Sequence, residues 1–126
     1  DVGRLLIVEV KPGSAGSGVT WAPLQAAFYA SLFQAWASEI GTGAVEVISS
    51  MLEQRKKLGL ASAPARLLLD PLEIVPIVAI GGGIPSAEIA KRMWTVRDLL
   101  VRADTRWRSL EIWQVEESVR RTILDP

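Results

Sequence analysis

Two nearly uninterrupted apolar runs constrain the fold of this chain more than any other feature. They are LLIVEV at residues 5–10 and IVPIVAI at residues 74–80, and a glycine-rich segment follows each of them. Runs this short and this apolar are typical of strands that are buried on both faces, in a sheet covered by helices. We therefore predict an α/β domain with a mixed sheet flanked by helices.

Helical patterns occupy much of the remaining chain. Pro23 suits the first turn of a helix that runs to about Ile40. Its apolar stripe recurs every four residues, at Leu24, Phe28, Leu32 and Trp36. A second helix is predicted over residues 44–58, with Thr42 as its cap, Ile48 and Met51 facing inward and Gly59 as its stop. A third is predicted over about residues 87–102 with Ser86 as its cap, then a strand at 110–115 and a tail helix at 116–124. The order is β-α-α-β-α-β, in a single domain over residues 1–126.

Composition narrows the chemistry. Fourteen basic and fourteen acidic residues cancel, so net charge gives no affinity for nucleic acid unless the basic residues cluster on one face. The chain has no cysteine and no histidine, which excludes thiolate zinc sites and Ser-His triads. Any metal site must be built from oxygen ligands, which favours Mg²⁺ or Mn²⁺. With no signal peptide and no apolar run of the ~18–20 residues that a membrane span needs, we expect a cytoplasmic protein without membrane contact.

Two glycine loops suggest phosphate binding. GSAGSGVT at residues 13–20 has the spacing of a P-loop, but Val19 stands where the lysine should be, so a connector is the preferred interpretation. IVPIVAIGGGIPSAEIA at residues 74–90 resembles the phosphate grip of TIM-barrel enzymes, although a barrel needs about twice this chain length. The resemblance implies an alternative function, a phosphate-ligand-binding α/β module that uses Gly81, Gly82 and Gly83 at the N-terminus of a helix. Otherwise these glycines only turn a strand into a helix.

Glu9 and Lys11 carry a second chemical signal. In a strand, residues two apart share a face, so the carboxylate and the ammonium group point the same way. Such a pair at the end of a buried strand is costly unless it is used or solvated. Phosphodiester hydrolysis uses it: the carboxylate holds Mg²⁺, the metal activates water, and the lysine orients that water or stabilises the developing charge.

The segment DVGRLLIVEVK, followed by Gln25-Ala-Ala-Phe-Tyr29 on the next helix, resembles the E-x-K and Q-x-x-x-Y motifs of the PD-(D/E)XK nuclease superfamily, RecB-like type. The resemblance covers about residues 1–80 and implies a restriction-endonuclease-like core. It implies that Glu9 binds Mg²⁺ or Mn²⁺ and that Lys11 serves the attacking water. Gln25 and Tyr29, one helical turn apart, would position the DNA strand or the outer shell of the metal.

The family needs a second acidic ligand, and this chain departs from the pattern there. Asp1 is the only acidic residue before Glu9, and an extended strand would place it about 26 Å away. We therefore expect an N-terminally incomplete domain of a larger parent protein, impaired as a nuclease. Asp70 or Glu73 could substitute on charge alone. A third interpretation is a non-catalytic interaction domain with the nuclease fold, whose open sheet edge would invite a homodimer.

Aromatic and basic side chains are further candidates for nucleic-acid contacts. Five tryptophans can stack bases but more often fill cores and interfaces; they are Trp21, Trp36, Trp94, Trp107 and Trp113. Four arginines could follow a phosphate backbone; they are Arg97, Arg102, Arg106 and Arg108. Because Asp98 and Asp104 intersperse them, a solvated face is the preferred interpretation. Substrate type and cleavage polarity are not encoded in these patterns.

Overall fold

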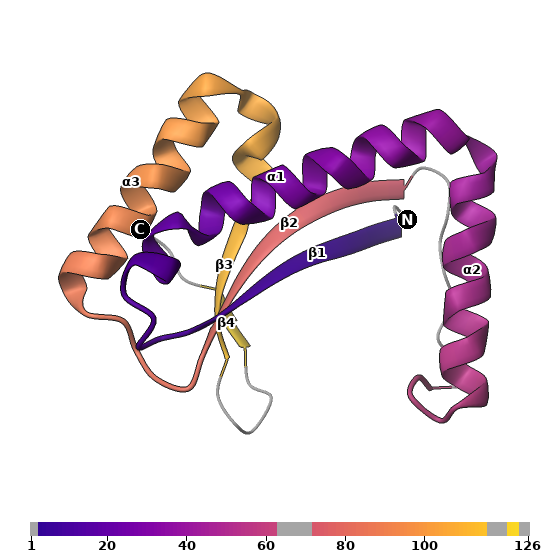
Figure 1. Cartoon of the computed structure of the whole chain (residues 1–126), viewed down its shortest axis with the longest axis horizontal. Coiled ribbons are helices and arrows are strands. Elements are labelled where there is room, and N and C mark those ends of the chain that lie inside the picture. Colours follow the sequence, from indigo (N-terminus) through magenta and orange to yellow (C-terminus); the bar gives the residue numbers. More distant parts are fainter. Residues whose placement is uncertain (1–2, 63–71, 116–120, 124–126) are drawn as a thin grey trace. The chain divides into compact units, whose positions relative to one another are not determined.

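The computed structural model describes residues 3–62, 72–115 and 121–123, and it confirms a mixed α/β chain (Figure 1). The elements are β1 (Gly3–Pro12), α1 (Ser17–Ile40), α2 (Thr42–Lys57), β2 (Leu72–Gly81), α3 (Ala87–Ala103), the 3₁₀ helix η1 (Thr105–Ser109), β3 (Glu111–Val115) and β4 (Arg121–Ile123). The predicted tail helix is wrong where the chain is described, because residues 121–123 pair with β3 instead. No described helix is both long enough and apolar enough to cross a bilayer.

The four strands lie in the order β1-β2-β3-β4. Gly13, directly after β1, donates its backbone N–H to the carbonyl of Gly81 at the end of β2, at 2.8 Å. The carboxyl ends of β1 and β2 therefore meet, and the two strands run parallel. β2 and β3 are also parallel, in a register from Ile77 opposite Glu111 to Gly81 opposite Val115. β4 runs antiparallel to β3, so the sheet is mixed, as predicted.

The chain divides into two compact units. The helical unit comprises Asp1–Leu5 and Leu32–Ile74, and the sheet unit comprises Leu6–Ser31 and Val75–Pro126. Within the sheet unit, residues 75–80 of β2 are buried together with Met93, Leu110 and Ile112. The candidate functional residues Glu9, Lys11, Gln25 and Tyr29 all belong to the sheet unit, so their geometry is described within that unit.

Strands β1 and β2 differ in burial. β2 is buried on both faces, as its sequence predicts, since residues 75–80 are all buried. The same prediction is wrong for β1, where Val8 and Val10 are exposed. Apolar composition predicts that a segment is a strand, but burial on the second face depends on a covering layer. β1 is an edge strand, and no described part of the chain covers Val8 and Val10.

Pro76 lies inside β2, a strand with neighbours on both sides. Because the Gly81 carbonyl points to β1, the backbone groups of odd-numbered residues of β2 face β1 and those of even-numbered residues face β3. The described part of β3 begins opposite Ile77, one residue beyond Pro76. The N–H that proline lacks would therefore have had no partner in β3, which is how a proline is tolerated in a central strand.

Helix α1 begins at Ser17, six residues before the predicted start, so Pro23 lies inside the helix rather than in its first turn. Gly16, with φ of +49°, makes this early start possible. The buried face consists mostly of small residues, namely Val19, Thr20, Ala22, Pro23, Ala26, Ala27 and Ala30. Leu24, Phe28 and Leu32 of the apolar stripe are exposed. Alanines let the helix approach the sheet closely, which leaves the large side chains on the outer face.

Helix α2 belongs to the helical unit. Its N-cap is Gly41, without a side-chain cap bond, so the prediction of Thr42 as the cap is wrong. Ala44 and Ile48 are buried, whereas Met51, which was expected to face inward, is exposed. Its end is confirmed: Gly59 has φ of +71° and donates to the Lys56 carbonyl, while Leu60 donates to that of Arg55. These two bonds form a Schellman motif.

Helix α3 begins where the sequence predicts. The Ser86 hydroxyl accepts a hydrogen bond from the Ile89 N–H at 3.4 Å, which satisfies one of the free donors of the first turn. We expect Ser86→Ala to lower the free energy of unfolding by about 1 kcal/mol, measured by urea denaturation. Ser50→Ala, at an exposed position inside α2, should cause no loss. Equal losses in the two variants would contradict a capping role for Ser86.

Candidate functional site

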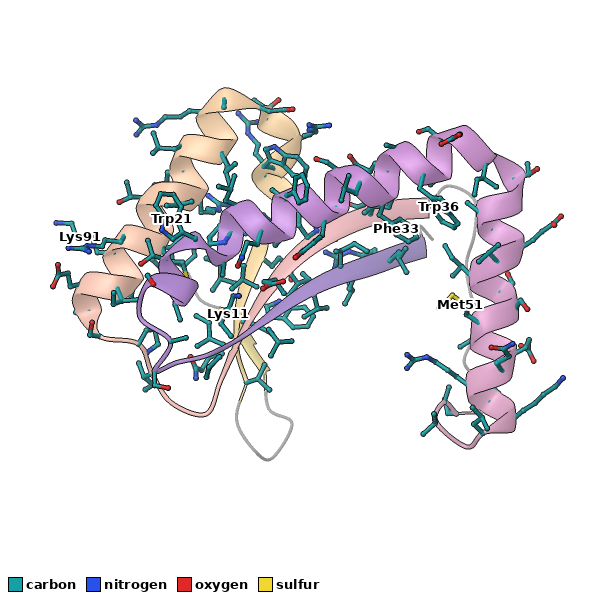
Figure 2. All side chains as sticks on the ribbon, in the orientation of Figure 1. Lys11, Trp21, Phe33, Trp36, Met51 and Lys91 are labelled. Atoms are coloured by element: carbon teal, nitrogen blue, oxygen red, sulfur yellow. The ribbon has the colours of Figure 1, made fainter. Side chains whose placement is uncertain are left out.

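Strand β1 continues to Pro12, two residues beyond the predicted strand end, so it includes both Glu9 and Lys11. Their side chains share one face, with Lys11 Nζ 2.8 Å from Glu9 Oε1. The Glu9 side chain is 17% exposed and that of Lys11 is 20% exposed. A Cβ placed at Gly18 would lie 3.8 Å from Lys11 Cδ, so the lysine stem runs beside the first turn of α1. Figure 2 shows Lys11 between the strands and α1.

The ion pair is chemically asymmetric. Lys11 engages one carboxylate oxygen of Glu9, and a carboxylate has a second oxygen with its own lone pairs. Partial burial strengthens the attraction between the two charges, but it also removes hydration from both groups. A carboxylate held in this way can accept a cation at its other oxygen while the ammonium group stays nearby. Carboxylate oxygen is the ligand that Mg²⁺ prefers.

Gln25 and Tyr29 have different surroundings, although they are one turn apart on α1. The Oε1 atom of Gln25 is buried and has no hydrogen-bond partner in the described part of the chain. Tyr29 is exposed, and its ring lies 5.8 Å from that of Phe28. A buried amide oxygen without a partner is costly in a folded protein. Of these two residues, Gln25 is therefore the one whose side-chain oxygen could accept a hydrogen bond or bind a cation.

A metal site at Glu9 needs a second acidic ligand. Asp1 and Asp70 lie outside the described residues. Glu73 is half exposed and lies 3.8 Å from Arg4. Among residues 3–62, 72–115 and 121–123, no group of three acidic, histidine or cysteine side chains could hold a metal ion. Glu9 is thus the only predicted metal ligand that is placed in the sheet unit.

The two glycine loops, which the sequence presents as separate signals, lie together. A Cβ placed at Gly13 would be only 2.1 Å from the Gly83 carbonyl oxygen, and Gln114 Nε2 donates to the same oxygen at 3.0 Å. The loops after β1 and β2 are thus tied to the end of β3. Ligands of open α/β sheets bind at this carboxyl edge. The sequence signal for this contact is the glycine-rich segment that follows each of the two apolar runs.

Val19, at the lysine position of the P-loop spacing, is fully buried. It faces the core from the first turns of α1, so the position does not present a side chain to a phosphate. Helix α1 begins at Ser17, inside the segment with P-loop spacing. The missing cation remains the reason to treat the first loop as a connector.

Two of these four arginines are paired with nearby acids. Arg106 Nε lies 2.6 Å from Asp104 Oδ2, and its guanidinium group lies 4.4 Å from the ring centroid of the buried Trp107. Arg97 Nη1 lies 3.4 Å from Asp98 Oδ1. Charges that are neutralised locally attract a phosphate backbone weakly. This arrangement agrees with a solvated face and adds no support for a DNA-binding surface.

Comparison with known proteins gives no relative. No protein-family model, no curated protein and no solved structure matches this chain. The restriction-endonuclease-like core therefore stays a prediction from the E-x-K and Q-x-x-x-Y motifs, and the functional argument depends on the site itself.

Proposed function

We propose that the sheet unit is the metal-binding part of a PD-(D/E)XK-like, Mg²⁺- or Mn²⁺-dependent nuclease that acts on DNA. The observation that carries the proposal is the Glu9–Lys11 pair, with 2.8 Å between Oε1 and Nζ and both side chains largely buried. Glu9 would hold the metal through its second carboxylate oxygen. Lys11 would orient the attacking water or stabilise the charge that develops on the phosphate.

Gln25 and Tyr29 have supporting roles in this proposal. The buried, unpartnered oxygen of Gln25 suits a hydrogen bond from a metal-bound water. Tyr29, exposed on the same helix, suits contact with a DNA strand. The site requires a second carboxylate, which the described residues do not place beside Glu9 in any metal-binding group. We accordingly expect this chain to bind the metal weakly and to cleave DNA poorly.

Metal binding gives the most direct test. We expect Mn²⁺ to bind weakly in calorimetry or electron paramagnetic resonance. Glu9→Gln should weaken this binding by about tenfold or more, since even outer-shell changes cost about 10–100-fold. Glu88→Gln is the matched control, because Glu88 is an exposed carboxylate paired with Arg92 on α3. The same variants and Lys11→Met are then assayed with Mg²⁺ or Mn²⁺ on single- and double-stranded DNA. Binding and residual cleavage that are unchanged in Glu9→Gln would rule out this site.

A second candidate function is phosphate-ligand binding at the carboxyl edge of the sheet. The contact between Gly13 and Gly83 favours this function, because it brings both glycine loops to the same point of the carboxyl edge. Titration with inorganic phosphate, followed by amide chemical shifts, separates the two candidates. Shifts centred on Gly82 support the phosphate module, whereas Mn²⁺-induced broadening centred on Glu9 supports the nuclease-like site.

A further inference from the structure

Helix α1 presents large apolar side chains to the outside of the sheet unit. Trp21 is 53% exposed, Leu24 is 45% exposed and Phe28 is 57% exposed. Their spacings of three and four residues place them on one face, one helical turn apart. We call these three residues, together with the exposed Leu99 of α3, the α1 face.

The α1 face lacks the charged residues of a solvated helix surface. Of the 24 residues of α1, only Glu39, near its C-terminal end, carries a charge. The first turn has no acidic residue and the last turn has no basic residue. A helix on the surface of a soluble protein normally has charged residues on its outer face. An uncharged helix face with large apolar side chains is typical of a surface that another protein covers.

A hollow of about 430 Å³ adjoins the α1 face, between α1 and α3. Trp21 of α1 and Ile89, Val96 and Leu99 of α3 give it an apolar lining, and Ser17, Arg92 and Thr95 contribute polar groups. Figure 2 shows Trp21 between these two helices. The hollow is large enough to accept an aromatic side chain from outside, and no charged partner is needed to fill it.

We propose that the α1 face binds the α1 face of a second copy of this chain, with the two helices antiparallel. Trp21 and Phe28 lie symmetrically about the point between Leu24 and Gln25, seven residues or about 10.5 Å apart. A two-fold axis at that point places Phe28 of each copy opposite Trp21 of the other, at the hollow. The contact is self-complementary, as a two-fold interface requires. It does not involve Glu9 or Lys11, the ion pair on which the proposed nuclease site rests.

The area of the α1 face suits such a dimer. Four large side chains, each about half exposed and each with roughly 200 Å² of surface, contribute about 400 Å² per copy. With the polar residues around the hollow included, the surface that both copies bury is roughly 1,000 Å² in total, the lower bound for a specific interface. An apolar centre with a polar rim is also the usual anatomy of a dimer contact.

Cysteine cross-linking tests the proposed geometry. The chain has no cysteine, so Leu24→Cys introduces one thiol, close to the two-fold axis. We expect a covalent dimer on mild oxidation or with a short bis-maleimide. Val47→Cys is the control, because Val47 is exposed on α2 and lies outside the α1 face. This variant should stay monomeric on a denaturing gel. Equal cross-linking of the two variants would overturn the proposal.

Sedimentation equilibrium tests the energetics without cysteine. The wild-type chain should be a dimer at about 100 µM, and Phe28→Glu should raise the dissociation constant by at least about 30-fold. Val47→Glu should leave it unchanged. Because Phe28 is exposed, Phe28→Glu should keep the wild-type circular dichroism spectrum. A monomeric wild-type chain would overturn the proposal. Co-sedimentation of that monomer with phosphatidylcholine vesicles, reduced in Phe28→Glu, would show that the α1 face binds a lipid surface and not a second copy.

Discussion

Met93→Ala is expected to destabilise the sheet unit by about 2–5 kcal/mol, the range for truncating a large buried side chain to alanine. Met93 is fully buried, and it is the buried residue of α3. Its side chain anchors a 17-residue helix whose other face is polar. Removing it leaves a cavity and withdraws the main apolar contact of α3. The midpoint of urea unfolding, followed by tryptophan fluorescence, measures the loss.

Met51→Ala is the matched control, because Met51 and Met93 are the two methionines of the chain. Met51 is 54% exposed on α2, and alanine has the better intrinsic helix propensity. We expect a change within about 0.5 kcal/mol, as for other exposed substitutions. If Met51→Ala destabilised the protein as much as Met93→Ala, the described burial of Met93 would not explain the effect.

Gly13→Ala is expected to lower the free energy of unfolding by about 1–3 kcal/mol, the range for inserting a methyl group into a filled space. The new Cβ would lie 2.1 Å from the Gly83 carbonyl oxygen and 2.6 Å from its carbon. Both atoms are backbone, so one of the two loops must move. That movement would also disturb the hydrogen bond from Gly13 to Gly81. Thermal and urea unfolding both measure the effect.

Gly18→Ala tests whether this loss is specific to the loop contact. Gly18 lies in the first turn of α1, and a Cβ there would be 3.4 Å from that of Ala15. We expect little change or a gain of up to about 1 kcal/mol, because alanine favours the helix more than glycine does. A larger loss in Gly18→Ala than in Gly13→Ala would disprove the close contact between the two glycine loops.

Signals that act within a few residues predicted much of the fold. The run at 74–80 became a buried strand, Ser86 became a helix cap, and Gly59 ended α2. The Glu9–Lys11 contact followed from the two-residue period of a strand. Each of these outcomes depends on side chains that are close in the sequence, so tertiary contacts were not needed to predict them.

Features that depend on distant contacts were predicted poorly. The four-residue period of Leu24 and Phe28 correctly indicated a helix face, but the alanine face is the one that packs inward. Residues 121–123 became a strand because β3 offered them an edge. In the candidate site, the exposure of Tyr29 and the buried oxygen of Gln25 depend on how α1 is rotated. A periodic pattern identifies helix faces without determining which of them meets the sheet.

Pro76 has a consequence for the chain before it folds. The segment around it, IVPIVAI, is uncharged and rich in β-branched residues, the composition of segments that stack into fibrils. While β2 is still unpaired, such a segment can join the same segment of another chain. Proline offers no donor to such a stack, and at position 76 the native sheet loses no hydrogen bond to β3 in exchange. Pro76 is therefore expected to oppose aggregation of this segment in the nascent chain, at little cost to the folded sheet.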